Sequence, residues 1–493
     1  MSHQAKFTHG STMRHIAIMS CTSAVGLMAL FLVDLLDMYF ISLLGHVELA
    51  AAIGFAGTLV FFNTSVSIGS SIAMGAMVSK ALGAKKLATA RRYAASALVF
   101  SFIAGCLVTS LVLSNAEPLL ALIGAKGVVA EKAYAYLTIL MPSAPVLAMA
   151  ISASSALRAT GDARRPMLAT LFGGGANAIL DPVFIFGLNL GIEGAAWASV
   201  IARLTIFLYA FFSMTYRHGL LAKPRVSYFK ADLKPILLIA VPAILANIAT
   251  PFGNALVTRQ IAYFGEDYVA GFAVVGRIIP VAFALLFALS GALGPIIGQN
   301  YGAKNLQRVQ ESIKNAIVFN ILYCLAVSGA LWLLKDSIIL FFGLNNKAAS
   351  LLEAFCPWIS LSFMFNGALF IANASFNNLQ RGLWATLLNA GKATIGTFPF
   401  ILIGGHLAGA EGVLMGQGFG SLVFGVLACS LALYRVKVLK ARFRQEEEEK
   451  TAVEPAMPMT PFCSSRAYIF EESQLCKETY DDETPPSIKT GSP

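Results

Sequence analysis

The sequence carries little charge. Only 13% of its 493 residues are Asp, Glu, Lys or Arg, whereas 57% are hydrophobic. A soluble globular protein has about 25% charged residues, so this chain lacks the charge needed to cover a water-exposed surface. For most of its length the composition excludes a soluble globular protein, a disordered chain and a small disulfide-bonded domain. It indicates a protein that crosses a membrane many times.

Metal-binding and catalytic patterns are also missing. Five of the seven cysteines lie in apolar stretches, and the other two, Cys463 and Cys476, lie near the C-terminus in no zinc-like spacing. The apolar segments contain no visible pairing of a nucleophile with a base. We therefore expect neither a metal cofactor nor an enzyme. The first apolar run, which begins near Ile16, is too long for a cleavable signal peptide.

What the chain does contain is a series of twelve apolar segments, each long enough for the roughly 20 residues of a transmembrane helix. The expected fold class is therefore an all-α membrane protein with twelve transmembrane helices. Loops after the even-numbered segments are rich in Lys and Arg, and the alternate loops are poor in them. The positive-inside rule then places both termini in the cytoplasm. The expected location is a plasma membrane, the inner membrane of a bacterium. The bases thus describe topology and give no reason to expect a nucleic-acid partner.

The two halves of the chain repeat each other. The stretch from Gly75 reads GAMVSKALGAKK, and the stretch from Gly294, 219 residues later, reads GPIIGQNYGAKN. Each half holds six segments, so both insert with the same orientation, as parallel repeats related by an axis along the membrane normal. We expect residues 15–216 and 235–434 to form an N-lobe and a C-lobe. Such a duplication is typical of transporters, with channels, flippases, receptors and membrane enzymes as alternatives.

The remaining parts of the chain are expected to lie in the cytoplasm. They are an N-terminus of residues 1–14, a loop between the lobes of residues 217–234 and a C-terminal region of residues 435–493. That region begins basic and becomes acidic, because from Gln445 on it holds 11 Asp or Glu against 4 Lys or Arg. Its EEEE run and its scarcity of apolar residues predict disorder after Arg444.

Three acidic residues lie deep within the apolar segments, namely Asp34, Asp37 and Asp181. A charge at the bilayer centre costs at least about 2.5 kcal/mol, so a carboxylate kept there is a candidate for function. Counted along helices that rise about 1.5 Å per residue, Asp37, Asp181 and Ser199 all lie about 8–11 Å below the outer boundary. Asn177 lies four residues before Asp181 and therefore on the same helix face.

The predicted cation-coupling site consists of Asp34, Asp37, Asn177, Asp181 and Ser199. Two carboxyl groups in a desolvated pocket can titrate as a pair and so exchange a proton. The same oxygens suit a hard cation, so a sodium ion at Asp37, Asn177, Asp181 and Ser199 is the alternative. A third interpretation is a structural network that holds three helices together. Proton or sodium would be a coupling ion, and we expect no resident cofactor.

Four further residues are candidates for the wall of a substrate cavity, namely Ser154, Ser155, Asn254 and Arg277. The serine hydroxyls suit helix packing equally well, and Arg277 suits a structural pairing with a carbonyl or an acid. Asn254 is the repeat counterpart of Asp34, because each stands eleven residues before a glycine.

Four motifs resemble those of a known family, the multidrug and toxic compound extrusion (MATE) transporters, in the branch that resembles DNA-damage-inducible protein F. They read VDLLDMYFISLLG up to Gly45, LRATGDARRPM from Leu157, NAILDPVFIFGLNLGIEGAAWAS from Asn177 and PIIGQNYGAKN from Pro295. A fifth, GAKK, is the first-half counterpart of the last one. The resemblance covers about residues 15–435.

The resemblance implies a cation site in the N-lobe, formed by Asp37, Asn177, Asp181 and a hydroxyl from the sixth helix, here Ser199. These are the residues that the depth count selects. The chain departs from the family at position 34, where Asp replaces the usual Asn. The counterpart of Asp181 in the second half is Thr397, so we expect coupling to reside in the N-lobe alone.

The resemblance also implies a fold and a function. The fold is a V of two six-helix lobes around a central cavity. The function is secondary active antiport, in which an inward gradient of protons or sodium drives export of small organic molecules, often cationic drugs or toxins. The expected partners are those molecules and the lipid bilayer, and we expect a monomer. The alternative is a lipid-linked oligosaccharide flippase, which needs many cavity bases to hold a pyrophosphate, whereas deep bases are scarce here.

Overall fold

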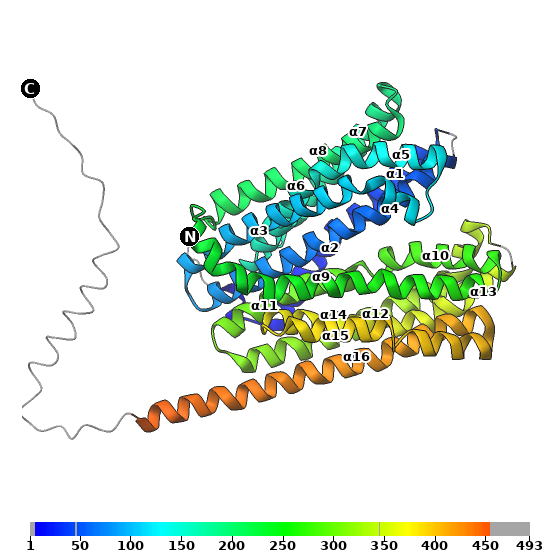
Figure 1. Cartoon of the computed structure of the whole chain (residues 1–493). Helices are drawn as coiled ribbons and strands as arrows, with labels where there is room; N and C mark the ends of the chain where they lie inside the picture. The colour runs from blue at the N-terminus through cyan, green and yellow to red at the C-terminus, as the bar shows by residue number, and fades with distance from the viewer. Residues whose placement is uncertain (1–4, 45–46, 345, 454–493) are drawn as a thin grey trace, which may run out of the picture. The chain divides into compact units, whose positions relative to one another are not determined.

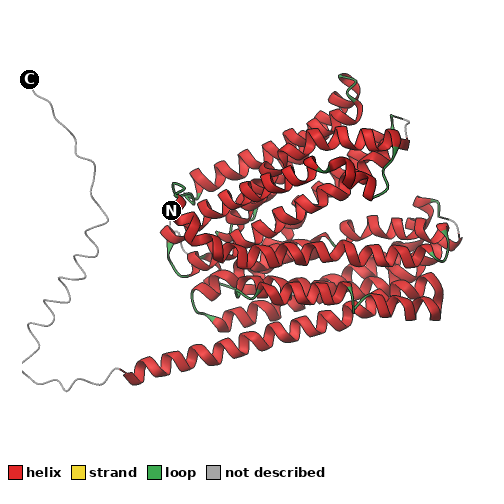
Figure 2. Cartoon of the chain, in the orientation of Figure 1, coloured by secondary structure: helices red, strands yellow, loops and turns green. Residues whose placement is uncertain are grey.

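The computed structural model describes residues 5–44, 47–344 and 346–453. Within these ranges the chain is helical and contains no strand (Figure 2), which confirms the all-α class. The first half contains the short helix η1 (Lys6–Thr8), α1 (Thr12–Ser42), α2 (Val47–Gly83), α3 (Leu87–Ser114), α4 (Ala116–Leu122), α5 (Gly127–Leu140), η2 (Met141–Ser143), α6 (Ala144–Ala159), α7 (Arg164–Pro182), η3 (Val183–Gly187), α8 (Gly191–Phe212) and η4 (Ser213–Arg217).

The second half follows the same plan (Figure 1). It contains α9 (Val226–Ala262), α10 (Glu266–Ala282), α11 (Ala284–Gly302), α12 (Leu306–Phe342), α13 (Asn346–Ala354), η5 (Phe355–Ile359), η6 (Ser360–Ser362), α14 (Phe363–Asn378), α15 (Gly382–Ala393) and α16 (Phe398–Val453).

The number of spans agrees with the prediction of twelve. In the described part of the chain, ten helical segments are long and apolar enough to cross a bilayer. An eleventh consists of α10 and α11, which meet at a bend of 44° beside Phe283, three residues after Pro280. The longest segment, Gly382–Glu446, divides at Ala408 and Gly409, where the backbone is not helical, and so supplies two spans.

This division is a tight helical hairpin built on glycine. Gly409 adopts φ of +62°, which side-chain-bearing residues avoid. After the turn, Gly412, Gly416 and Gly420 follow at intervals of four residues. A methyl group on Gly420 would lie 1.5 Å from the main-chain oxygen of Gly396. The last two spans therefore pack backbone against backbone along a stripe of small residues.

The two halves meet through a contact that repeats itself. A methyl group on Gly83, at the end of α2, would lie 1.9 Å from the main-chain oxygen of Gln299 in α11. A methyl group on Gly302, at the end of α11, would lie 2.0 Å from the main-chain oxygen of Lys80 in α2. Gly83 and Gly302 are 219 residues apart, as are Lys80 and Gln299. The contact is therefore symmetric: each half contributes one glycine and receives one glycine at equivalent positions. Two repeats related by a single axis are expected to meet in this way.

These contacts lie at the end of the bundle that carries the basic turns, which we call the basic end. It comprises the turns at residues 84–86, 160–163, 218–225, 303–305 and 379–381. Toward the opposite end each half has a separate apolar core, one around Ile41, Leu137 and Ile185 and the other around Val257 and Phe355.

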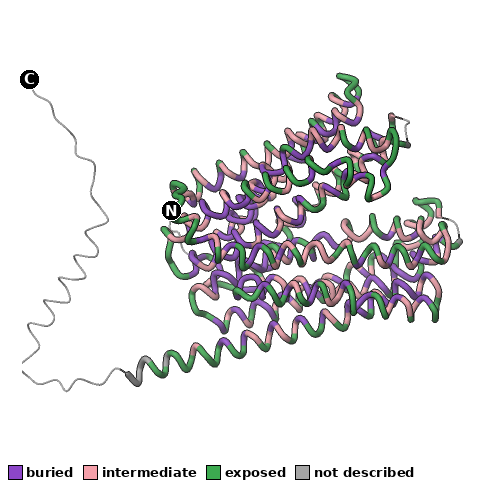
Figure 3. The backbone as a smooth tube through the Cα atoms, in the orientation of Figure 1, coloured by how far each residue is buried: buried purple, intermediate pink, exposed green. Residues whose placement is uncertain are grey.

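The outer sides of the helices are apolar as well. Exposed positions recur along the helices of both halves in Figure 3, and many hold large apolar side chains. Leu107, Leu208 and Leu333 are 60%, 55% and 76% exposed. Such surfaces are typical of contact with lipid.

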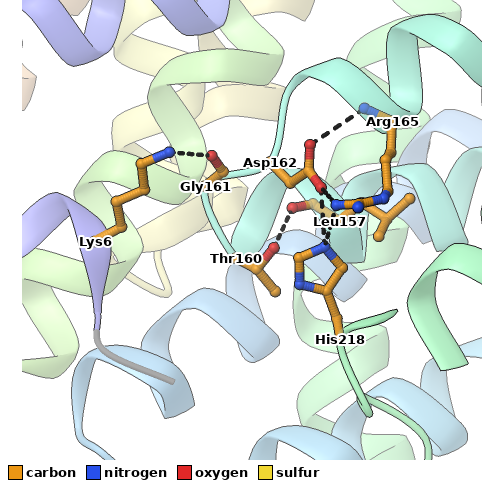
Figure 4. Close-up of polar contacts among 7 residues, drawn as sticks. All are labelled: Lys6, Leu157, Thr160, Gly161, Asp162, Arg165 and His218. Atoms are coloured by element: carbon orange, nitrogen blue, oxygen red, sulfur yellow. Dashed lines mark hydrogen bonds and ion pairs between the residues drawn. The ribbon is translucent and has the colours of Figure 1, made fainter. Parts of the chain in front are cut away.

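The segment before the first span is anchored to both halves at the basic end. The Phe7 main-chain N–H donates to Oε1 of Gln299 at 2.9 Å, and the Phe7 carbonyl accepts from Nδ2 of Asn300 at 3.2 Å. Lys6 Nζ donates to the carbonyl of Gly161 in the first half at 3.0 Å, as Figure 4 shows. The Phe7 side chain is 1% exposed. The N-terminal segment therefore links the two halves.

A polar turn at the basic end joins α6, α7 and η4. In Figure 4 the side chains of Arg165 and His218 point toward the carboxylate of Asp162. His218 Nε2 lies 2.9 Å from Oδ2 of Asp162, and Arg165 forms an ion pair with the same oxygen. Burial alone would raise the pKa of Asp162, but hydrogen bonds from His218 and Arg165 outweigh it and hold the pKa below its usual range.

The C-terminal part of α16, from Leu439 on, forms a unit of its own. The sequence predicts disorder after Arg444, but the structure continues the helix to Val453. The reason is local: Arg442 pairs with Glu446 at 3.0 Å and Arg444 with Glu448 at 2.8 Å, each at the i,i+4 spacing that stabilises a helix. The rest of the predicted tail, residues 454–493, lies outside the described residues.

Candidate functional site

The first candidate site is a cluster of acidic and amide side chains in the first half. Asp37 comes from α1, and Asn177 and Asp181 come from the last turns of α7. Pro182 ends the α-helical part of α7, because it has no N–H to continue the hydrogen bonds. The chain goes on as the wider turns of η3, a π-helix. Irregular turns of this kind occur often at functional sites.

Asn177 joins the two carboxylates. Its Nδ2 donates to Oδ1 of Asp37 at 2.7 Å and to Oδ2 of Asp181 at 2.9 Å. Asp181 is fully buried and Asn177 is 3% exposed, whereas Asp37 is half-buried. The other oxygen of Asp181, Oδ1, is buried without a hydrogen-bond partner among the described residues. One amide therefore holds two carboxyl groups together and leaves one buried acceptor atom open.

The other two predicted coupling residues lie at the margin. Asp34 is exposed, and no hydrogen bond joins it to Asp37, Asn177 or Asp181 within the described chain. Ser199, on α8, is half-buried, and no hydrogen bond joins it to either carboxylate within the described chain. The structure thus brings together three of the five predicted residues by direct hydrogen bonds.

Tyr136 and Arg203 are members of this region that the sequence did not single out for coupling. The Tyr136 hydroxyl lies close enough to Asp37, Asp181 and Arg203 for their charges to act on it. Arg203 itself donates to the carbonyl of Leu140 at 3.2 Å and to the Ser143 hydroxyl at 2.9 Å. The sequence does not predict that Tyr136 and Arg203 lie near the carboxylates, because α5 and α8 are far apart along the chain and come together only in the fold.

The second candidate site is a cavity of about 380 Å³ between the halves. Residues of both halves line it, from α1, α2, α6 and α7 on one side and α9, α11, α14 and α15 on the other. Its polar wall consists mainly of amides and hydroxyls. The polar lining residues are Ser23, Ser71, Ser155, Thr170, Asn247, Thr250, Ser290, Asn373, Asn377, Asn378 and Asn389, together with one charged residue, Arg158.

The four predicted cavity residues have different places. Ser155 lines the cavity, whereas Ser154 is buried away from it. Asn254 and Arg277 are exposed and are not among the described lining residues. Arg158, one helical turn from Ser154, belongs to the wall instead, although the sequence suggests only a basic loop at that point.

The chain resembles known proteins over most of its length. The family model MatE matches residues 23–183 and 242–403, one stretch in each half. The chain is 25% identical over 429 residues to the "FAD transporter" of Shewanella oneidensis, covering 86% of this chain and 95% of that protein. It is 24% identical over 433 residues to the "Multidrug export protein MepA" of Staphylococcus aureus, covering 86% and 93%.

A solved structure has the same fold. A mutant of the Vibrio cholerae MATE transporter VcmN matches with a TM-score of 0.81 at 24% identity, over 86% of this chain and 96% of that one.

Proposed function

Because the chain belongs to the MatE family of multi-pass transporters, which are not enzymes, we propose that it is a secondary active antiporter. In this proposal it exports small organic compounds in exchange for protons that bind at Asp37 and Asp181. The observation that carries the proposal is the Asn177 amide, which holds two carboxyl groups together while a buried oxygen of Asp181 has no hydrogen-bond partner among the described residues.

The arrangement supports a proton rather than a sodium ion. Two carboxylates that share one amide repel each other when both are ionised, and a proton on either relieves the repulsion. A sodium ion needs several oxygens directed at one point, but here the amide directs its N–H groups at both carboxylates.

The second part of the proposal is alternating access. The cavity lies between two halves that are in backbone contact at the basic end, through Gly83 with Gln299 and Gly302 with Lys80. With the basic end and both termini in the cytoplasm of a bacterial cell, this contact closes the cavity on the cytoplasmic side. Cargo would leave from this state, and separation of the same contact would admit new cargo. Since one chain builds both sites, we propose that a monomer suffices.

The family indicates the general class of the cargo but not its identity. The relatives are named for multidrug export and for FAD transport, so a small organic compound is the shared element. A lipid-linked oligosaccharide is not favoured, because a pyrophosphate needs several bases and the described wall offers Arg158 alone.

The test uses purified protein in sealed liposomes, with dye efflux driven by a pH gradient or by a sodium gradient. We expect the pH gradient to drive efflux and the Asp181→Asn variant to lose at least tenfold of that rate. The matched control is Asp336→Asn, which removes a carboxylate from a side chain that is 83% exposed. Undiminished pH-driven efflux by Asp181→Asn would refute the role of the cluster. Efflux driven by sodium alone would refute the choice of the proton.

A further inference from the structure

We propose that the central cavity binds organic anions and that the Arg158 guanidinium is its anion-binding group. This inference rests on the proposed function, since it concerns the cargo of the same transporter. It departs from the cationic cargo that the resemblance implies, because the charge of the cavity wall has the opposite sign.

Arg158 is the single charged residue among the described residues that line the cavity. It lies in the last turn of α6, is half-buried, and has no hydrogen bond or ion pair to another described side chain. Two other bases within the spans do have partners: Arg203 donates to Leu140 and Ser143, and Lys392 donates to Oδ1 of Asn366. A guanidinium in a sheltered cavity without a carboxylate is prepared to receive an anion from outside the chain.

The position of Arg158 connects the two halves. Its Nε lies 4.0 Å from the point where a methyl group on Gly291 of α11 would be. Because Gly291 has no side chain, the guanidinium can face the second half at close range. An anion held by Arg158 therefore lies against both halves, where its binding would respond to their separation.

The remaining wall specifies the rest of the ligand. Phe287 and Phe370 both line the cavity, with ring centroids 5.5 Å apart and an interplanar angle of 45°. They offer an apolar surface for a flat ring. The polar part of the wall consists mainly of amides and hydroxyls, which carry no charge of their own. The preferred ligand is thus a planar aromatic anion.

Arg158 has a second possible role, which the test must separate from the first. A base in the last turn of a helix interacts favourably with the helix dipole and stabilises the helix. That role requires a positive charge but no ligand. It predicts a change in melting temperature and no change in preference between ligands of opposite charge.

The experiment measures equilibrium binding of two dyes with the same xanthene ring system to the purified full chain, by fluorescence anisotropy. Carboxyfluorescein is the anion and tetramethylrhodamine ethyl ester is the cation. The variants are Arg158→Gln and Arg158→Lys. The matched control is Arg164→Gln, which removes the charge of an exposed arginine six residues away that does not line the cavity.

We expect carboxyfluorescein to bind at least tenfold more tightly than the cation. A hydrogen bond to a charged group corresponds to roughly a ten- to hundredfold difference in affinity. Arg158→Gln should therefore lose about that factor for the anion, with Arg158→Lys retaining most of the affinity and Arg164→Gln all of it. Equal or tighter binding of the cation would overturn the proposal, and that comparison needs no variant. So would an Arg158→Gln protein that melts normally and binds the anion as well as the native chain.

The two proposals fail differently. If no ion gradient drives transport of either dye, the antiport function is wrong. If a pH gradient drives export of the cationic dye but not of the anionic dye, the antiport function is supported and the proposed anion site is wrong.

Discussion

The N-terminal segment offers a direct test of how the two halves are held together. Phe7 is 1% exposed and lies where α11 of the second half meets the turn at Gly161 of the first. Replacing a buried Phe by Ala typically costs about 3–5 kcal/mol. The main-chain hydrogen bonds to Gln299 and Asn300 do not depend on the side chain and should survive. We take the lower figure, about 3 kcal/mol, which shifts an equilibrium roughly a hundredfold.

The perturbation should favour separation of the halves at the basic end, because the contact made by Phe7 exists only while they are together. The assay is a pulsed electron-spin distance measurement between labels at Lys86 and Lys304, two exposed residues of the basic turns of the first and second half. We expect Phe7→Ala to add a population at longer distance, and Phe7→Leu to add much less. Phe341→Ala serves as control, since that side chain is 83% exposed. An unchanged distance distribution in folded Phe7→Ala protein would refute the reasoning.

Three further predictions concern stability, measured as the melting temperature of purified protein. Gly420→Ala should be destabilised by about 1–3 kcal/mol or more through overpacking, whereas Gly329→Ala, with nothing within 4 Å, should not change. Asp232→Ala should cost about 2 kcal/mol, because this buried carboxylate accepts from an arginine at 2.9 Å and a serine at 2.8 Å, and the arginine is partly exposed. Asp162→Asn should melt lower at neutral pH. Since the native pKa is depressed, the stabilisation is complete above the unfolded pKa of about 3.9. The difference should therefore begin to shrink as the pH falls below about 4, and it should vanish only below the depressed native pKa.

The parts of the molecule that the sequence predicts correctly are those with a periodic or repeated signal. Long apolar runs indicate helices because a bilayer admits little else. Gly83 and Gly302, which are shared by the stretches from Gly75 and Gly294, become the contact in which Gly83 meets Gln299 and Gly302 meets Lys80. Depth below the membrane surface, which follows from counting residues along a helix, selects Asp37 and Asp181, and in the structure both accept hydrogen bonds from Asn177. Their role in coupling stays a prediction.

The parts that the sequence does not predict depend on rotation and packing. Depth alone cannot tell which face of α1 a residue occupies, so Asp34 and Asp37 look alike in the sequence, although only Asp37 bonds Asn177. For the same reason Ser154 and Ser155 are equivalent candidates, and the fold places only Ser155 in the cavity wall. The α16 helix beyond Arg444 depends on side-chain pairs, which a composition-based prediction of disorder ignores.

The charges of the two sites together determine how the membrane potential acts on transport. Moving one charge through about 100 mV changes the free energy by about 2.3 kcal/mol. If a proton enters at Asp37 and Asp181 while a monovalent anion leaves by way of Arg158, both movements release energy when the inside is negative, for a total of about 4.6 kcal/mol. Exchange of one proton for one monovalent cation moves no net charge and gains nothing.

Export of an organic anion should therefore respond to the potential even without a pH gradient. The measurement uses liposomes in which valinomycin and a potassium gradient set the potential, with the pH equal on both sides. We expect anion efflux to accelerate when the side facing the basic end is negative and to slow when the potential is reversed. Asp181→Asn should abolish much of the response by removing the proton from the cycle, whereas the exposed-site variant Asp336→Asn should keep it. Anion efflux that ignores the potential in both directions would contradict a cycle in which a proton and an anion move oppositely, because that cycle must carry net charge.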